Sequence, residues 1–201
     1  MKQFVITINR QFASLGRTIA VGLAEKLGVP FYDRDVVEQT AKSMGLPISY
    51  ISEKEEASGS VYFRRQYPLG MGVPSLLDEI YAVQQNIILD FAKKGSCIIV
   101  GRNAEHILRD APNRMSVFVY APYAARLANC TEELGLDEEE AKHLIHTVDR
   151  ARELYRRRYA PEEKSDFDGR DIMLDSSRVG VDGAITILEA AARHMFADEN
   201  E

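Results

Sequence analysis

FVITINRQFASLGRTIAVGLAEKLG, residues 4–28, is the stretch that most constrains the architecture. It opens with a continuous β-rich apolar run, Phe4–Ile8, which is typical of a strand buried on both faces. Gly28 and Pro30 close a helical pattern at its far end. Apolar side chains recur there at the spacing of one helix face, at Ile19, Ala20, Leu23, Ala24 and Leu27. The stretch predicts a buried strand that turns directly into an amphipathic helix.

The loop between this strand and helix reads RQFASLGRT and ends in Gly16, Arg17 and Thr18. These three residues occupy the last places of the phosphate-binding pattern G-x-x-x-x-G-K-[ST], with arginine in place of lysine. Gln11 stands where the pattern has its first glycine. Backbone N–H groups at a helix N-terminus attract anions, and Ser14 can add a donor. On the pattern alone, a phosphate-binding loop and a plain strand-to-helix turn both remain open.

Four further apolar runs predict strands, at Pro30–Asp33, Cys97–Gly101, Met115–Tyr120 and Asp171–Ser176. Helical stripes of apolar residues separate them over residues 76–91, 141–148 and 181–195, the first two opened by the caps Ser75 with Asp78 and Asp137 with Glu140. Strands separated by helices indicate right-handed crossovers and a parallel sheet covered on both faces. The predicted fold class is α/β, in a single domain with a five-stranded sheet.

Composition narrows the classes of function. The chain has 201 residues, 45% of them hydrophobic, and its net charge of −6 argues against bulk binding to nucleic acid or to acidic membranes. Cys97 and Cys130, the two cysteines, lack metal-ligand spacing and indicate reduced thiols rather than a zinc site. No run reaches the roughly 18 apolar residues of a membrane span, and residues 1–10 favour a strand over a signal peptide. A cytoplasmic protein is expected, and both a monomer and a homodimer stay open.

One segment, residues 46–75, does not follow the alternation of strands and helices. It combines turn residues, charges, several aromatic side chains and the pair Arg64 and Arg65. A connection of this length in a compact domain is typically a functional flap or a disordered linker. We expect it to be mobile.

Three stretches outside the loop resemble segments of small nucleotide kinases. FYDRD, residues 31–35, places an acid at the end of the second strand, and IIVGRNAEHILRDAP, residues 98–112, resembles the third-strand DGR segment of bacterial cytidylate kinases. DIMLDSSRVGVDGAITILEAA, residues 171–191, resembles the closing strand, LDS turn and final helix of the same family. DRARELYRRRYA, residues 149–160, stands where that family has an arginine-rich lid. In this order and spacing, the chain resembles the cytidylate kinase-like branch of the P-loop nucleoside monophosphate kinases.

The resemblance implies a three-layer P-loop NTPase fold, ATP with Mg²⁺, and phosphoryl transfer to a nucleotide. In that scheme Ser14 and Gly16 belong to the phosphate loop, Arg17 binds the β- and γ-phosphates, and Thr18 binds Mg²⁺. The chain departs from the family at Gln11, at Arg17, and at Val100, which stands where the third strand of the family has an acid.

Two residues at the ends of predicted strands are candidates for the acceptor side. Asp33 could orient a Mg²⁺-bound water or the acceptor oxygen, or it could merely cap the helix that begins near Arg34. Arg102 follows the third strand directly and could clamp the acceptor phosphate. Its alternative is a surface salt bridge.

Arginines at the end of the helix that contains residues 141–148 suggest a lid over ATP, about residues 149–168. Arg152 and Arg156 are its expected contacts, because Arg152 continues the inward stripe of that helix. Helix-dipole stabilisation of a charged C-terminus is the alternative. In the segment 46–75, Arg64 and Arg65 could bind the acceptor monophosphate, or lie in an ordinary exposed flap.

The residues and the resemblance together favour an ATP- and Mg²⁺-dependent kinase of a nucleoside monophosphate, CMP-like, or of a similar small phosphate acceptor. Two alternatives stay open. One is a nucleotide-binding sensor or interaction protein that has lost catalysis. The other is a P-loop kinase of a small molecule that is not a nucleotide.

Overall fold

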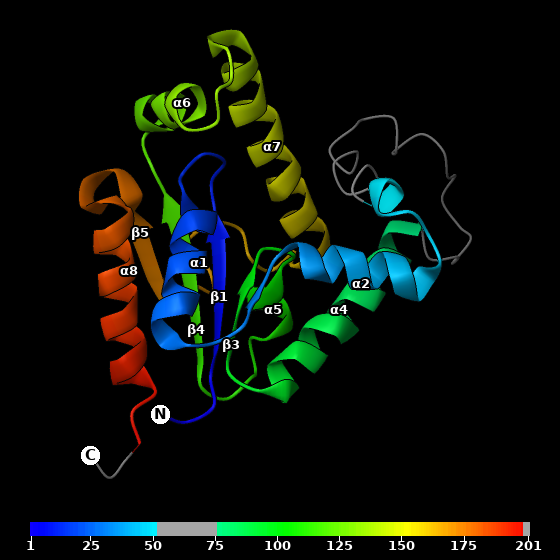
Figure 1. The fold of residues 1–201 in the computed structure, drawn as a ribbon. Helices are drawn as coiled ribbons and strands as arrows, with labels where there is room; N and C mark the ends of the chain where they lie inside the picture. Colours follow the sequence, from blue (N-terminus) through cyan, green and yellow to red (C-terminus); the bar gives the residue numbers. More distant parts are fainter. Residues whose placement is uncertain (52–75, 199–201) are drawn as a thin grey trace.

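Parallel strands alternate with helices along the chain (Figure 1). The structure is a computed structural model, and it describes residues 1–51 and 76–198. Its elements are β1 (Val5–Arg10), α1 (Gly16–Leu27), β2 (Phe31–Tyr32), α2 (Arg34–Met44), α4 (Leu76–Lys94), β3 (Cys97–Val100), α5 (Ala104–Ile107), β4 (Arg114–Tyr120), α6 (Tyr123–Glu132), α7 (Glu138–Tyr159), β5 (Ile172–Asp175) and α8 (Ser176–Met195). The predicted α/β class, with five strands, is confirmed.

The sheet has the order β2-β3-β1-β4-β5, and all its pairs are parallel. β1 lies in the middle, where Val5 is in register with Cys97 of β3 and with Arg114 of β4. Since the strands are parallel, their carboxyl ends meet at one edge. That edge is the place where open α/β sheets bind ligands.

Helices cover both faces of the sheet. α1 and α8 lie side by side on one face, while α4 and α5 pack on the other (Figure 1). The alternation of β1 matches this arrangement, because Ile6 and Ile8 face α1 and α8, whereas Val5 faces α4 and α5. The predicted three-layer arrangement is confirmed.

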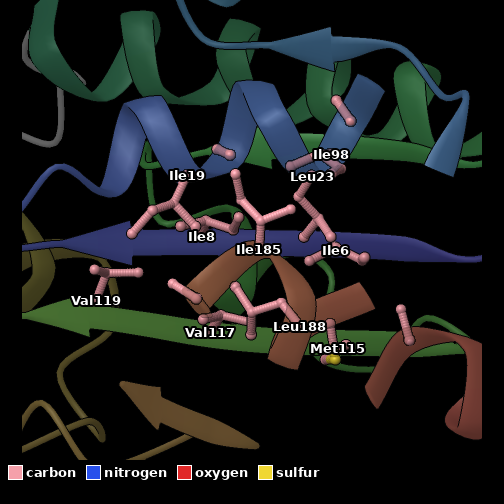
Figure 2. Packing of buried hydrophobic residues seen from close by; sticks show 14 of the residues in the cluster. Ile6, Ile8, Ile19, Leu23, Ile98, Met115, Val117, Val119, Ile185 and Leu188 are labelled. Carbon is pink, nitrogen blue, oxygen red and sulfur yellow. The ribbon is translucent and has the colours of Figure 1, made fainter. Parts of the chain in front are cut away.

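The main core lies between the sheet and the pair α1 and α8. Figure 2 shows Ile19 and Leu23 of α1 meeting Ile185 and Leu188 of α8 above β1 and β4. Gly22 permits the close approach of the two helices, since a Cβ atom there would lie 2.4 Å from Cδ1 of Ile185. This core fixes α1, and with it the loop that precedes α1.

The helix ends follow local sequence signals. The side chain of Asp137 accepts a hydrogen bond from the backbone N–H of Glu140 at 2.9 Å, as the predicted cap requires. Gly28 ends α1 with a φ of 66°. α5 and α6 were not predicted, because α5 is a single turn and α6 buries only Arg126 and Cys130. The predicted cap at Ser75 lies outside the described residues.

α6 and α7 form a hairpin beyond the carboxyl edge of the sheet, above the loop that follows β1 (Figure 1). A small apolar cluster of Cys130, Ala141 and Ile145 holds the two helices together. Phe12 and Ala13 of the loop pack against the same cluster. Thus the loop is packed against the hairpin as well as against the sheet. None of the described helices is long and apolar enough to cross a membrane.

Candidate functional site

A large cavity opens at the carboxyl edge of the sheet. Its volume is about 1630 Å³, and it is lined by the loop after β1, the turn after β3, and parts of α2 and α7. Pockets for one small molecule usually measure about 300–1,000 Å³. The cavity therefore has room for two substrates side by side.

The loop after β1 curls although its glycines are few. Ala13 and Leu15 have φ angles of 58° and 59°, in the left-handed region. Alternation of left-handed and right-handed residues turns successive N–H groups toward one point, the geometry of an anion-binding nest. Gly16 is required by contact, since a Cβ atom there would lie 2.6 Å from Cβ of Arg10. The loop thus has left-handed residues on both sides of Ser14, as anion-binding nests do.

Gln11 explains how the loop begins without the first glycine of the pattern. Its N–H donates to the carbonyl of Val119 at 3.0 Å, which extends the pairing of β1 with β4. Its side-chain Oε1 accepts a hydrogen bond from the N–H of Ala121 at 3.2 Å. Gln11 therefore ties the start of the loop to β4 and to the residue that follows β4.

Side chains of α6 and α7 hold the loop from above. Asp149 accepts a hydrogen bond from the N–H of Phe12 at 2.7 Å and forms an ion pair with Arg126. Asn129 donates to the carbonyl of Ala13 at 2.8 Å. The loop geometry is therefore determined partly by residues more than a hundred positions later, which sequence patterns did not single out.

Asp33 is the acidic centre of the site. It is 8% exposed and lies 2.8 Å from Nε of Arg17 and 3.8 Å from Nη2 of Arg10. It occupies the N-cap position of α2, yet its side chain makes no capping hydrogen bond with the described residues. The predicted N-cap position is thus confirmed, while the carboxylate faces two arginines instead of the N–H groups of the helix. Arg17 is 60% exposed and also lies over the ring of Phe31, 5.7 Å from its centroid.

Arg10, at the end of β1, is a site residue that the sequence analysis missed. Burial first, and then the nearby charges of Arg152 and Arg102, lower the pKa of its guanidinium to about 9, although Asp33 opposes the shift. Arg152 also has a lowered pKa, again because of burial first, although Asp149 counteracts it. Nη1 of Arg152 donates to the carbonyl of Arg10 at 2.9 Å. No nearby sequence pattern marked Arg10, because an arginine after a strand is common at a surface.

The turn after β3 is left-handed over three residues. Gly101, Arg102 and Asn103 have φ angles of 72°, 57° and 52°. A left-handed conformation costs about 1–2 kcal/mol for a residue other than glycine, so the turn stores strain beside the cavity. The turn directs Arg102 into the lining of the cavity, where its charge acts on Arg10 and Arg152.

Ser14 and Thr18, two of the predicted loop residues, lie in different environments. The hydroxyl of Ser14 is fully buried and lies within hydrogen-bond distance of the carbonyls of Gln11 and Val119, at 3.0 and 3.1 Å. The hydroxyl of Ser14 therefore serves the backbone of the loop itself, and its part in phosphate binding stays a prediction. Thr18 is exposed in the first turn of α1 and caps no helix, since Leu15 holds the N-cap position. Its hydroxyl remains a candidate Mg²⁺ ligand.

The predicted lid consists of the end of α7 and the connection to β5. Arg156 is 7% exposed, donates to the carbonyl of Ser165, and pairs with Asp166 at 3.3 Å. It lines the cavity, but its guanidinium holds the connection in place. Arg64, Arg65 and most of the predicted flap lie outside the described residues.

The sequence model of the cytidylate kinase-like family matches residues 5–178. The chain belongs to the cytidylate kinase-like family. This confirms the resemblance carried by the loop, FYDRD, the third-strand segment and the closing segment. Among curated proteins no sequence match was found.

Solved structures agree with the fold. An uncharacterized protein from Eubacterium ventriosum ATCC 27560 is 26% identical, with a TM-score of 0.72 over 94% of this chain and 98% of that chain. Shikimate kinase from Acinetobacter baumannii, in complex with shikimate, is 15% identical, with a TM-score of 0.54 over 97% and 96%. A gluconokinase from Sinorhizobium meliloti 1021 is 13% identical, with a TM-score of 0.50 over 96% and 95%. The fold is that of the P-loop kinases.

The donor set suits Mg·ATP. The described residues contain no group of three or more acidic, histidine or cysteine side chains that could hold a metal alone. Mg²⁺ in kinases is bound mostly by phosphate oxygens and water, with one or two protein oxygens. Thr18 can supply such an oxygen, and the nest at Ala13 and Leu15 can cradle phosphate.

Replacing Ala13 by glycine tests the strained loop. Ala13→Gly should raise the free energy of unfolding by about 0.5 kcal/mol, because relief of a left-handed alanine, about 1–2 kcal/mol, exceeds the entropy cost of glycine. Chemical denaturation measures the change. Ala190→Gly, at an exposed and regular position of α8, should instead lower stability by about 1 kcal/mol. An equal loss of unfolding free energy in both variants would contradict the left-handed conformation of Ala13.

Replacing Arg10 tests the buried charge. Its pKa is lower in the folded protein than in the unfolded chain, so the fold is destabilised wherever Arg10 is charged, fully so below about pH 9. Arg10→Met should therefore raise stability at pH 7 by about 1 kcal/mol. The gain should shrink above pH 9, as Arg10 in the parent loses its proton.

The same variant should lose its response to pyrophosphate, which raises the melting temperature of the parent by binding the folded state. Arg193→Met, on the exposed side of α8, should change neither property. An Arg10→Met protein that is less stable than the parent and still responds to pyrophosphate would overturn the assignment of Arg10 to an anion-binding site.

Proposed function

We propose that the protein is an ATP- and Mg²⁺-dependent kinase that phosphorylates a nucleoside monophosphate, or a similar small phosphate acceptor. The observation that carries the proposal is the surplus of guanidinium groups at the cavity. Arg10 and Arg17 pair with Asp33, and Arg102 and Arg152 lie near Arg10 in the same cavity. Because like charges repel, an anion that enters the cavity is stabilised by these groups.

The roles follow from position. Arg17 lies at the N-terminus of α1, next to the nest, and serves the β- and γ-phosphates of the donor. Arg102 and Arg152 reach the same cavity from the turn after β3 and from α7, and hold the phosphate of the acceptor. Asp33 orients Arg17 and Arg10 through its two carboxylate oxygens.

Phosphoryl transfer asks for little covalent chemistry from the protein. ATP supplies the transferred group, and the arginines stabilise the charge that spreads over the phosphate oxygens in the transition state. Asp149 keeps the loop in its curled form through the N–H of Phe12. Movement of the connection after α7 would exclude water from the reacting groups.

A screen of acceptors tests the proposal. The protein is mixed with Mg·ATP and, in turn, CMP, UMP, AMP, GMP, shikimate and gluconate, and ADP release is measured. We expect turnover with at least one nucleoside monophosphate and none with shikimate or gluconate. Turnover with a sugar acid alone favours the kinase of another small molecule. ATP binding with no turnover on any acceptor favours the sensor, which the arginine at position 17 makes the main competing hypothesis.

Arg17→Ala separates a phosphate contact from a surface residue. Nucleotide affinity or the phosphoryl-transfer rate should fall by about 2 kcal/mol, roughly 30-fold, the size of a lost charge-assisted hydrogen bond. The melting temperature of the protein alone should barely change, because the side chain is 60% exposed. Lys26→Ala, in the last turn of the same helix, serves as the matched control. Loss of stability with full nucleotide binding would assign Arg17 a structural role.

A further inference from the structure

A polar layer lies on the face of the sheet opposite α1 and α8. β1 turns Thr7 and Asn9 to that face, and β4 turns Ser116 to it, between residues that enter the main core. Thr7 and Ser116 are 2% and 1% exposed. A buried sheet face of this kind is normally apolar, so the polar layer needs partners.

Arg170 is the centre of this layer. Its side chain is 1% exposed, and its Nη2 lies 3.1 Å from Oε1 of Glu105 and 3.3 Å from Oε2 of Glu163. Oε1 of Glu105 also accepts a hydrogen bond from Nδ2 of Asn9 at 2.6 Å. Three elements therefore meet here: β1, α5 and the connection before β5.

The remaining nitrogens of Arg170 are unpaired. Neither Nε nor Nη1 has a hydrogen-bond acceptor among the described residues, and Nδ2 of Asn103, which is 5% exposed, has none either. Both residues line the large cavity. A buried donor without an acceptor costs about 1–3 kcal/mol, so its retention beside a cavity points to a ligand. Since all these atoms are donors, the ligand must offer acceptor oxygens.

The charges around Arg170 decide which oxygens fit. Glu105 and Glu163 already face its guanidinium. A second anion placed there would be repelled by these carboxyl groups. The part of the cavity around Asp33 has the opposite character, with an excess of arginines. The cavity is thus suited to a ligand that carries one anionic group and one uncharged polar group.

We propose that Arg170 and Asn103 are specificity-determining residues that donate hydrogen bonds to carbonyl or hydroxyl oxygens at the uncharged end of the acceptor. Glu105 and Glu163 position Arg170 for this contact. The inference rests on the proposed function and assigns the acceptor class: a phosphomonoester with acceptor oxygens at its other end, and no second anion. Nε and Nη1 of Arg170 are covered in the structure, so neighbouring side chains must shift for the two nitrogens to contact the acceptor.

Calorimetry with the full chain tests the proposal. The parent is titrated with ribose 5-phosphate, with the four ribonucleoside monophosphates, and with fructose 1,6-bisphosphate, whose second phosphate probes the charge argument. The best nucleotide should bind at least tenfold more tightly than ribose 5-phosphate, and the bisphosphate no more tightly than ribose 5-phosphate. Equal affinity for nucleotides and ribose 5-phosphate, or tighter binding of the bisphosphate, would overturn the proposal. If no phosphomonoester binds at all, the proposed function itself fails.

Two variants assign the contact. Arg170→Lys keeps the charge between Glu105 and Glu163 but removes Nε and Nη1, and Asn103→Asp keeps the shape and tolerates the left-handed turn while replacing a donor by an acceptor. Each should weaken the best nucleotide at least tenfold and leave ribose 5-phosphate within twofold.

Arg114→Lys, whose side chain pairs with Asp171 away from the cavity, is the control and should change neither ligand. Equal weakening of both ligands by Arg170→Lys, or tighter nucleotide binding by Asn103→Asp, would overturn the assignment. Because Arg170→Lys preserves the ion pairs, thermal unfolding should confirm a folded protein. If it does not, Asn103→Asp alone decides between these outcomes.

Discussion

Mutual repulsion among guanidinium groups at one edge of the sheet is the constraint on which the site depends. Arg10 and Arg17 pair with one buried carboxylate, Asp33, and Arg102 and Arg152 lie near Arg10. Burial first, and these neighbouring charges second, lower the pKa of Arg10 to about 9. The chain as a whole carries a net charge of −6, so this positive region is local. A local field of the sign opposite to the rest of the molecule concentrates anions in the cavity without attracting them elsewhere.

Holding such a cluster requires a rigid frame, and the frame is distributed along the chain. The loop after β1 keeps its curl although alanine and leucine occupy left-handed positions. Asp149 and Asn129 compensate by binding its backbone from α7 and α6. The loop and the hairpin therefore form one mechanical unit: a shift of α7 is transmitted to the N–H of Phe12. In a kinase this linkage would couple closure over the donor to the shape of its phosphate cradle.

The sheet and its covering helices could be predicted because burial on two faces leaves a clear pattern. All five strands were identified from apolar runs, and α7 was identified with its cap at Asp137. The site was only partly predictable. Arg17, Asp33, Arg102 and Arg152 do converge at the cavity. Arg10 was missed because its importance arises from Asp33 and Arg152, which are remote in sequence. Ser14 was assigned to phosphate because serine is frequent in such loops, yet its hydroxyl points to the carbonyl of Val119.

The unpaired nitrogens of Arg170 are a second feature that lowers the stability of the fold. A protein that folded for stability alone would pair Arg170 fully or replace it with an apolar residue, because a buried guanidinium with two unused nitrogens is expensive. Strain in the turn at Arg102 and Asn103, the depressed pKa of Arg10 and the unpaired nitrogens of Arg170 all lower stability, and all of these residues line the cavity. Destabilising features are expected to gather around one cavity when a bound ligand, rather than the folded chain, supplies the partners of the charged and polar side chains there. The proposed ligand, with an anionic group for the arginines and neutral oxygens for Arg170, would satisfy both sets of groups.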